Sequence, residues 1–390
     1  MRILEGVRVL EMGTFITGPA AAMILADLGA DVIKLERPGT GDPFRAFKGG
    51  LYSPHFQTYN RNKRSITLDT RAPADLGVLD SLVSEADVFI QNFRPGVAED
   101  LHVGAQRLQE LNPSLVYCSI SGFGRDGPDC RRPAYDTVAQ AASGWLRLLI
   151  NPRNPRVMGP AIADSVTGFY AALGVLAALH ERRKTGRGRL VELSMLEAMC
   201  HFNLDDFTHY FSAGEVMGPY SRPSVSQSYV FETSDKKWVA VHLSSPEKFW
   251  EGFVDALESP SLLVDPRFSE RQARIKNQDA LIELVTPIVQ RRTREQWCAR
   301  FEQAGIPYSP IYDSSDALED PQARHLSIAV ETHHPTMGKS RTVRFPVSFD
   351  GQKLSHVSPP PTLGEHDGAV RSARAQHWRD RRPGKVNAAE

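Results

Sequence analysis

The feature that most constrains the fold is an alternation of short β-branched runs and helical patterns in the first third of the chain. Strands are expected at residues 7–11, 31–35, 87–91 and 114–120, and helices at residues 20–28 and 74–84. Pro19 suits the first turn of the first helix, because a proline there loses no hydrogen bond. Strands that alternate with helices form a parallel sheet with helices on its faces. The sequence therefore predicts an α/β fold.

The longest helical pattern covers residues 166–184. Its apolar face comprises Phe169, Leu173, Leu176 and Leu179. A basic cluster lies at the C-terminal end of the helix, before Gly186. Cations at the end of a helix are favourable because they face its negative dipole end. A strand at residues 190–194 and a helix at residues 195–210 are expected next.

The composition changes after about residue 213. Residues 214–223 are rich in Gly, Pro and Ser and predict a linker. Two strand patterns at residues 226–233 and 237–243 then predict a hairpin, and helical patterns follow at residues 247–256, 271–290 and 293–304. A smaller α+β domain is therefore expected over residues 224–318, after a first domain over residues 1–213. Residues 319–390 become strand-like again and end in a tail that is basic from Arg371.

Charge and cysteine content exclude several classes of protein. Lys plus Arg and Asp plus Glu number 46 each, so no net charge favours nucleic acid or an anionic membrane surface as a partner. The four cysteines show no C-x-x-C pair, which argues against a disulfide framework or a structural zinc site. No apolar run approaches the roughly 18 residues of a membrane span, and the N-terminus lacks a signal-peptide pattern. We expect a cytoplasmic protein.

Two patterns imitate cofactor sites. Residues 122–127 fit G-x-G-x-x-G after a predicted strand, but a dinucleotide site needs a helix at the third glycine, and here Pro128 follows. A nicotinamide dehydrogenase therefore stays a remote alternative. His201, Asp205 and His209 recur every four residues on the expected helix and could gather metal ligands, although a polar helix face has the same spacing. We expect no metal site.

Asp164 lies in the segment Gly-Pro-Ala-Ile-Ala-Asp-Ser-Val-Thr-Gly, directly before the long helix. A simple interpretation is an N-cap, in which the side chain accepts hydrogen bonds from free backbone N–H groups. A second is a covalent nucleophile, because a carboxylate at a helix N-terminus stays ionised and can attack a carbonyl. The residues alone leave both open.

Several segments, taken in order, resemble the class III (CaiB/BaiF) CoA-transferases, the family of formyl-CoA transferase and carnitine CoA-transferase. The matches lie at residues 4–11, 18–19, 26–42, 62–66, 86–88, 92–96, 111–113, 135–140, 163–168, 184–188 and 363–366. The resemblance implies a large Rossmann-like domain built from both chain ends, with residues 319–390 returning to it, and a smaller inserted α+β domain. It also implies an interlocked homodimer.

The resemblance also implies a function and a site. The chain is expected to move coenzyme A between an acyl-CoA and a small carboxylic acid through an aspartyl-CoA thioester on Asp164. No bound prosthetic group is expected, since the CoA thioester is a substrate. Tyr135 matches a tyrosine close to the reacting groups, and the implied CoA contacts are Arg37, Lys63, Arg64 and Arg94. Arginine suits this role because it binds phosphate in a bidentate manner.

Departures from the family pattern limit the possible reactions. The α-methylacyl-CoA racemases of this fold have a histidine where this chain has Tyr135, and a tyrosine is a weaker acid–base partner near neutral pH. Racemisation of a 2-methylacyl-CoA is therefore the second hypothesis, and a non-catalytic CoA-binding protein is the third. The glycine-rich loop of formyl-CoA transferase is missing and Ile16 replaces its glutamine. We expect an acid larger or less polar than oxalate or formate.

Overall fold

The computed structural model describes residues 2–354, 357–372 and 378. Contacts divide the chain into two compact units, each described by itself below. The first, which we call the sheet unit, comprises Met1–Leu146, Met158–Leu204 and Arg324–Glu390, and the second, the helical unit, comprises Arg147–Val157 and Asp205–Ala323. Most of the predicted basic tail after Arg371 lies outside the described residues.

The sheet unit is built on six strands in the order β3-β2-β1-β4-β5-β6, all of them parallel. The strands are β1 (Arg8–Glu11), β2 (Asp31–Glu36), β3 (Lys63–Thr67), β4 (Val88–Gln91), β5 (Val116–Ser121) and β6 (Leu190–Ser194). This is the order of a doubly wound Rossmann-like sheet, which changes direction between β1 and β4. The expectation of a parallel α/β sheet is confirmed. In such sheets, ligands bind beyond the carboxyl ends of the strands at the point where the order reverses.

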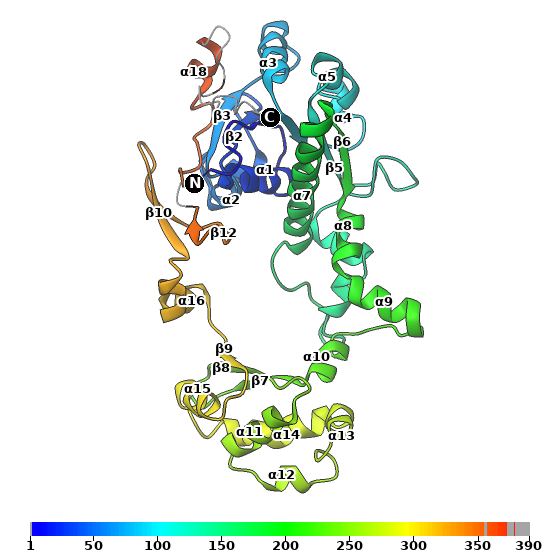
Figure 1. Cartoon of the computed structure of the whole chain (residues 1–390), viewed down its shortest axis with the longest axis vertical. Helices are drawn as coiled ribbons and strands as arrows, with labels where there is room; N and C mark the ends of the chain where they lie inside the picture. Colours follow the sequence, from blue (N-terminus) through cyan, green and yellow to red (C-terminus); the bar gives the residue numbers. More distant parts are fainter. Residues whose placement is uncertain (1, 355–356, 373–377, 379–390) are drawn as a thin grey trace, which may run out of the picture. The chain divides into compact units, whose positions relative to one another are not determined.

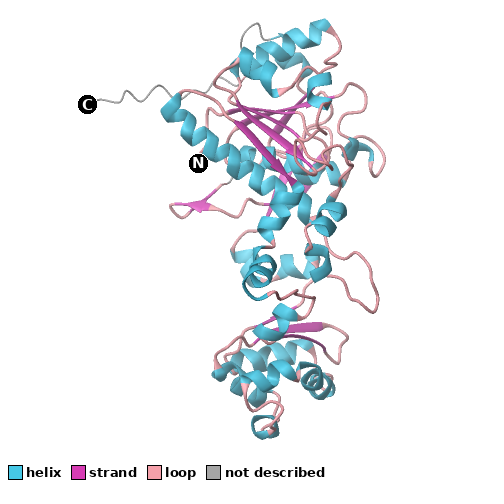
Figure 2. Ribbon diagram, turned by 90° about the vertical axis from the view of Figure 1, so that its right-hand side faces the viewer, coloured by secondary structure: helices cyan, strands magenta, loops and turns pink. Residues whose placement is uncertain are grey.

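Helices cover both faces of this sheet (Figure 2). On one face α1 (Thr17–Asp27) and α7 (Ile162–Thr185) pack against Val9, Val32, Val88 and other buried side chains of the strands. On the other face α3 (Pro73–Glu85) and α5 (Ala105–Leu111) pack against Ile33, Phe89 and Tyr117. The result is three layers, with two apolar cores on either side of the sheet.

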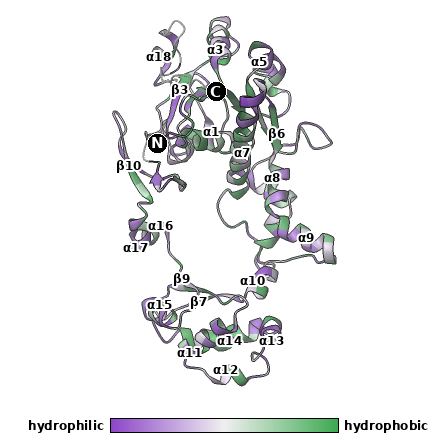
Figure 3. Ribbon diagram, viewed as in Figure 1, coloured by the Kyte–Doolittle hydropathy of each residue, from purple (hydrophilic) through white to green (hydrophobic). Residues whose placement is uncertain are grey.

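Helix α7 begins at Ile162, four residues before the predicted start. Its length and composition alone would let it cross a membrane, but half of its most apolar window is buried inside the protein, where it packs on α1. A Cβ atom on Gly168 would come within 2.9 Å of the Cβ of Ala20, so glycine permits this close approach. Its apolar character, visible in Figure 3, is explained only in part by this core position, because Phe169 and Leu173 of the predicted apolar face are exposed.

The other elements of the sheet unit are short. They are η1 (Pro43–Ala46), α2 (Pro54–Tyr59), α4 (Val97–Asp100), α6 (Asp136–Ala142), α8 (Met195–Phe202), the hairpins β10 (Ala329–His334)/β11 (Gly338–Val343) and β12 (Ser348–Phe349)/β13 (Gln352–Lys353), and α18 (Asp367–Ser372). A further short helix, η2 (Trp145–Leu148), begins in this unit and ends in the helical unit. The helix predicted at residues 195–210 is wrong as one element. It is interrupted at Asn203, and α9 (Leu204–Ala213), which belongs to the helical unit from Asp205 on, begins after that residue.

The helical unit has an antiparallel sheet in the order β7-β8-β9, formed by β7 (Ser228–Glu232), β8 (Trp238–His242) and β9 (Tyr308–Pro310). Its helices are α10 (Ser221–Ser226), α11 (Glu247–Ala256), α12 (Ser261–Val264), α13 (Arg271–Lys276), α14 (Gln278–Val289), α15 (Arg294–Gln303) and α16 (Ser314–Glu319), and α17 (Pro321–His325) begins at its end (Figure 1). Trp250, Phe253, Trp297 and Phe301 form its aromatic core.

Candidate active site

Asp164 is the third residue of α7 and is not its N-cap. The cap position is Ala161, whose side chain makes no capping hydrogen bond. Asp136, 28 residues earlier, takes that role: its Oδ1 accepts hydrogen bonds from the backbone N–H of Ala163 at 2.8 Å and of Asp164 at 3.3 Å. The N-cap interpretation of Asp164 is therefore wrong. Because another residue caps the helix, the carboxyl group of Asp164 is left available for chemistry.

Asp136 is held in place by its own helix. It is the first residue of α6, and its Oδ2 accepts a hydrogen bond from Nε2 of Gln140 at 2.6 Å. Gln140 is buried, so this contact fixes the carboxylate that caps α7. The contact between Asp136 and the start of α7 was not expected from the sequence. Its signal was the Tyr-Asp pair directly before a short helical pattern.

The charge state of Asp164 differs from the expectation of a fully ionised carboxylate. Burial and the negative charge of Asp136 raise the pKa of Asp164 to about 7. The positive end of the α7 dipole opposes this change, but such a contribution is worth only about 0.3–1 kcal/mol at most exposed sites. Loss of hydration is the larger effect for a mostly buried carboxyl group. Near pH 7 a substantial fraction of Asp164 is therefore protonated.

Tyr59 and Ser165 lie beside Asp164. Burial raises the pKa of Tyr59, a hydrogen bond with Ser165 lowers it, and the charges of Asp164 and Asp136 raise it further. The hydroxyl of Ser165 donates to the carbonyl oxygen of Ala161 at 2.9 Å. That hydroxyl is therefore engaged with the backbone of the same turn.

Tyr135 lies at the edge of an aromatic surface next to this turn. Its ring is 61 % exposed and meets the ring of Phe15 edge-on, with 5.9 Å between the centroids. Phe15 contacts Phe44 at 5.2 Å and Phe47 at 6.3 Å. Phe15, Tyr59 and Ala161 also pack around the same small core of Ile16, Ala20, Phe44 and Phe56. The aromatic surface therefore adjoins the first turn of α7.

Arg37 and Arg94 are exposed at the carboxyl edge of the sheet. Arg37 directly follows β2, and Arg94 lies three residues after β4. Between them, Asn92 joins the loop after β4 to the loop after β1. Its Oδ1 accepts a hydrogen bond from the backbone N–H of Thr14, and its Nδ2 donates to the carbonyl oxygen of Thr14 and to Oγ1 of Thr17. These two arginines flank the β1/β4 reversal, which is the expected ligand position in a doubly wound sheet.

Lys63 and Arg64 are placed differently. The Nζ atom of Lys63 is fully buried and donates to Glu11 at 3.1 Å, to the carbonyl of Pro19 at 2.9 Å and to Asn60 at 2.9 Å. All three ammonium protons are therefore used inside the protein. Burial and the like charge of Lys34 lower the pKa of Lys63 to about 8, although Glu11 opposes them.

Arg64 forms a bidentate pair with Asp31, with distances of 3.1 and 2.7 Å, and Asp31 begins β2 at the opposite, amino edge of the sheet. The structure thus separates the four predicted CoA contacts. Two are exposed cations at the carboxyl edge, and two are paired with carboxylates of the protein.

A buried charge network supports the loop that carries Phe15. Lys34 pairs with Glu11 at 3.1 Å and with Asp42 at 3.0 Å, and donates to the carbonyl of Gly13 at 2.9 Å. Asp42 in turn accepts a hydrogen bond from the backbone N–H of Phe15 at 3.2 Å. Phe15 has a left-handed backbone with φ of 61°, which is uncommon for a side chain of this size. The network therefore fixes an unfavourable backbone conformation next to the site.

The cofactor-like patterns of the sequence find no support among the described residues. Turns and bends follow β5 through residue 132, and no helix opens at Gly127. His201 lies on α8 with its Nδ1 2.6 Å from the hydroxyl of Tyr170, while Asp205 and His209 lie on α9 after the break at Asn203. Within residues 2–354, 357–372 and 378 no group of three metal-ligating side chains was found.

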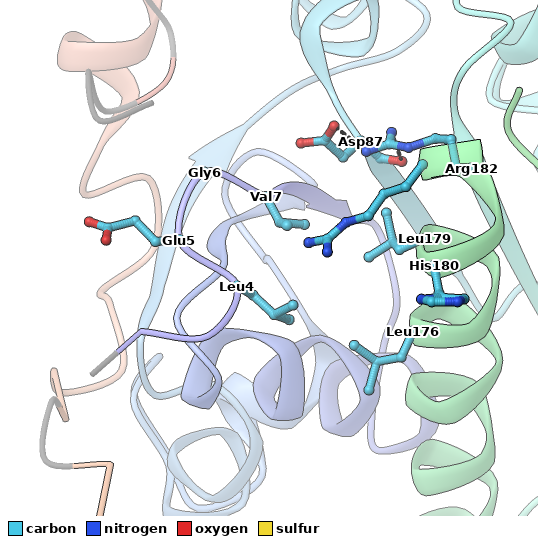
Figure 4. A pocket seen from close by; sticks show the side chains of 10 residues that line it. Leu4, Glu5, Gly6, Val7, Asp87, Leu176, Leu179, His180 and Arg182 are labelled. Atoms are coloured by element: carbon cyan, nitrogen blue, oxygen red, sulfur yellow. Dashed lines mark hydrogen bonds and ion pairs between the residues drawn. The ribbon is translucent and has the colours of Figure 1, made fainter. Parts of the chain in front are cut away.

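A cavity of about 480 Å³ lies away from Asp164, at the amino edge of the sheet (Figure 4). It is lined by Leu4, Glu5, Gly6, Val7, Asp87, Leu176, Leu179, His180, Arg182 and Arg183, and Arg182 pairs with Asp87 at 2.7 Å. With 1.5 Å of rise per residue, His180 is about 24 Å along α7 from Asp164. The cavity is therefore separate from the carboxyl edge of the sheet.

The sheet unit contains a doubly wound sheet, and a desolvated carboxyl group lies at the start of α7, close to the carboxyl edge of that sheet. This arrangement is typical of an α/β enzyme. Comparisons with known proteins identify the family. Residues 4–367 match CoA-transferase family III. Human succinyl-CoA:glutarate CoA-transferase is 31% identical over 370 residues, which cover 93% of this chain and 84% of that protein. Succinyl-CoA–D-citramalate CoA-transferase of Chloroflexus aurantiacus is 32% identical over 375 residues, which cover 95% and 93%.

A solved structure gives the same result. The crystal structure of a CaiB/BaiF family protein from Brucella suis matches with a TM-score of 0.84 at 30% identity, covering 94% of this chain and 98% of that chain. The chain therefore belongs to CoA-transferase family III, and it is a CoA-transferase. The resemblance drawn from the sequence motifs is confirmed.

Proposed function

We propose that this enzyme transfers coenzyme A between two carboxylic acids through a covalent aspartyl-CoA thioester on Asp164. The observation that carries the proposal is the division of roles at the start of α7. Asp136 accepts hydrogen bonds from two N–H groups of the first turn, and the carboxyl group of Asp164 is mostly buried without a counter-ion among the described residues. An unpaired buried carboxyl group is costly, and such groups concentrate at functional sites.

In the proposed reaction, an oxygen of the Asp164 carboxylate attacks the thioester carbon of the donor acyl-CoA. The C–S bond breaks, CoA leaves as a thiolate, and a mixed anhydride remains. The thiolate then attacks the aspartyl carbonyl carbon, the anhydride C–O bond breaks, and the donor leaves as a carboxylate. The acceptor carboxylate attacks the resulting aspartyl-CoA thioester, and the same two steps run in reverse. No proton is gained or lost overall, and each step is a simple acyl transfer.

Arg37 and Arg94 are proposed to hold the phosphate groups of CoA. Both are exposed cations at the carboxyl edge, on either side of the strand reversal. Arginine can contact a phosphate through two N–H groups at once. Tyr135 is proposed to contact the substrate close to Asp164. A phosphate contact from Lys63 or Arg64 would first require loss of the protein contacts that these residues make.

We also propose a homodimer of interlocked chains. Phe169 and Leu173 are exposed on α7 at 62% and 61%, and side chains of this size favour burial against another surface. Light scattering coupled to size exclusion would give twice the monomer mass of 43.3 kDa, whereas a mass near 43.3 kDa would exclude the dimer.

The test of the mechanism is chemical trapping. Succinyl-CoA incubated with the enzyme and then treated with hydroxylamine or borohydride should modify Asp164, as located by peptide mass spectrometry. Asp164→Ala should lose both the modification and transfer activity. The matched variant Asp136→Asn keeps an oxygen that can cap α7, so it should still be trapped at Asp164. Full transfer activity in Asp164→Ala would exclude the mechanism.

The same samples test the other two hypotheses. A racemase would exchange the α-proton of a 2-methylacyl-CoA with deuterium from the solvent without any acceptor acid. A non-catalytic CoA-binding protein would bind acyl-CoA but give no adduct and no exchange with any donor and acceptor pair.

A further inference from the structure

The cavity at the amino edge of the sheet is a concave site that the proposed function does not use (Figure 4). Its volume of about 480 Å³ lies within the range of about 300–1,000 Å³ that small-molecule sites occupy. All of the residues that line it belong to the sheet unit. One compact unit therefore forms a space that is large enough for a small organic molecule.

One wall of the cavity is a single face of α7. Leu176, Leu179, His180 and Arg183 follow one another at the spacing i, i+3, i+4 and i+7, which places them on the same side of a helix. The facing wall is the turn before β1, which contributes residues 4–7. The wall on α7 thus changes from aliphatic to basic along the helix.

The aliphatic part of the cavity is continuous with the core of the sheet unit. Leu4 and Leu179 are buried members of the core that α1 and α7 form with the sheet, and Val7 and Leu176 are partly buried side chains packed against it. A hydrocarbon group bound here would extend this core, and removal of its surface from water favours binding.

The acidic groups near the cavity are already neutralised or directed elsewhere. Asp87 pairs with Arg182 at 2.7 Å, and its other oxygen accepts the backbone N–H of Arg8 at 2.7 Å. Arg182 also donates to the carbonyl oxygen of Ser114 at 3.2 Å. Figure 4 shows the carboxylate of Glu5 on the outer side of its turn, directed away from the leucines.

Arg183 is the cation that the cavity can offer to a ligand. It is exposed, and within the described ranges 2–354, 357–372 and 378 it makes no hydrogen bond or ion pair. His180, one turn earlier, is likewise exposed and can add a hydrogen bond from its ring. A guanidinium group binds a carboxylate through two parallel N–H groups.

Basic side chains at the end of a helix also have a simpler explanation, because they complement the helix dipole. Lys184 satisfies that explanation equally well, since it is exposed in the same last turn. Lys184 does not line the cavity, whereas Arg183 does. The dipole accounts for the charge of both residues, and the cavity distinguishes between them.

We propose that the cavity is a second binding site, for a monocarboxylate with an aliphatic chain. The carboxylate pairs with Arg183, and the chain lies on the aliphatic wall formed by Leu4, Val7, Leu176 and Leu179. An inorganic phosphate ion would leave that wall unused. The site is about 24 Å along α7 from Asp164, so the proposal does not depend on the mechanism of CoA transfer.

Hydrogen–deuterium exchange of the full-length enzyme with octanoate as the probe tests the location of the site. No acyl-CoA is added, so no adduct forms at Asp164. Octanoate should slow exchange in peptides that cover residues 2–7 and 176–185, whatever it does near Asp164. Unchanged exchange in these two segments at concentrations that saturate binding in calorimetry would overturn the proposal.

Two neighbouring variants test the role of the guanidinium group. Arg183→Ala should raise the octanoate concentration needed for half-maximal protection of residues 2–7 about tenfold, because a charged hydrogen-bonding pair is lost. Arg183→Lys should recover part of that loss. Lys184→Ala removes a cation from the same turn and should behave like the parent. Both positions are exposed, so thermal unfolding should be alike in Arg183→Ala and Lys184→Ala. Equal effects of these two variants on protection would overturn the proposal.

A short series of probes tests the class of ligand. 1-Octanol has the same chain without the charge, and inorganic phosphate has the charge without the chain. We expect each to protect residues 2–7 and 176–185 less than octanoate at the same concentration. Equal protection by 1-octanol would overturn the pairing with Arg183, and stronger protection by phosphate would overturn the assignment to a carboxylate.

Discussion

Glu36 and Asp164 are two largely buried carboxyl groups in the same compact unit, and their surroundings are opposite. Glu36 accepts hydrogen bonds from Nε and Nη2 of Arg45 at 2.8 and 2.7 Å, from Ser65 at 2.6 Å and from the backbone of Asp42 at 3.0 Å. Burial alone would raise the pKa of Glu36, but Arg45 and Lys34 hold it below the usual value. Asp164 has a carboxylate neighbour instead, and its pKa rises to about 7.

The difference shows where the protein places an unfavourable charge. Around Glu36 every buried charge has a partner, which is the usual condition for burying ions in a stable core. At Asp164 the part of the chain that the structure describes provides no counter-ion and places a like charge nearby, so the folded chain is less stable than it could be. Such a cost is typical of functional groups, because a weakly solvated carboxylate is a more reactive nucleophile.

The largest stability effect is expected from breaking the paired region. Glu36→Gln leaves Arg45 buried without its counter-charge, which should lower the free energy of unfolding by about 3–5 kcal/mol. Urea unfolding followed by tryptophan fluorescence would measure it. The control Glu181→Gln breaks the exposed pair with Arg189 and should leave the midpoint unchanged. Equal urea midpoints for Glu36→Gln and Glu181→Gln would contradict the claim that the buried charge pairs stabilise the protein more than the exposed pair.

Asp164→Asn should raise the free energy of unfolding, whereas Glu36→Gln lowers it. The folded pKa of Asp164, about 7, is above the ordinary value of 3.8, so the native state holds the proton more tightly than the unfolded chain. This stabilising contribution is complete below pH 3.8 and is lost as the pH rises through 7. The neutral variant should therefore be more stable than the parent at pH 8, by up to about 4 kcal/mol from 1.36 kcal/mol per pKa unit. Thermal unfolding at pH 4, 6 and 8 would show the gap growing with pH; a constant gap would contradict the account.

The same comparison applies to the arginines. Arg37→Ala removes an exposed cation at the carboxyl edge, and we expect KM for acyl-CoA to rise about tenfold with little change in stability. Arg64→Ala removes the bidentate pair with Asp31, so it should lower the unfolding midpoint and leave KM almost unchanged. Steady-state kinetics at saturating acid would separate them. A larger KM effect for Arg64→Ala would return that residue to the CoA site that the sequence resemblance implied.

The smallest change is expected from Asp136→Asn. This variant removes the negative charge beside Asp164 but keeps the side-chain oxygen that caps α7. The acid limb of the profile of kcat/KM against pH reports the ionisation of Asp164, which must lose its proton to attack. The limb should lie near pH 7 in the parent and shift to lower pH in the variant. An unchanged limb would show that Asp136 does not raise the pKa of Asp164.

Much of the fold could be predicted from local patterns. The β-branched runs predicted β1, β2, β4 and β5, and the long apolar pattern predicted α7. Strand β3 was not predicted because it begins with Lys63 and Arg64, charged residues that usually indicate an exposed segment. Both are buried beside carboxylates that neutralise them, Glu11 and Asp31, and those partners are distant in the sequence. No local pattern reports such pairs.

The candidate site shows the same limit. Asp164 was found through motif context, and its position before a helix suggested a cap. The true cap is Asp136, and that contact spans 28 residues and two helices. Helix α8 ends at Phe202, so His201 does not share one helix with Asp205 and His209, whose regular spacing could have imitated a metal site. Local chemistry identified the residues, and tertiary contacts assigned their roles.

The most direct test of the account is the mass of the Asp164 peptide after reaction with acyl-CoA and hydroxylamine. We predict an aspartyl hydroxamate at Asp164 in the parent and in Asp136→Asn, and an unmodified peptide in Asp164→Ala. A hydroxamate on another carboxyl group, or transfer activity without any adduct at Asp164, would contradict it.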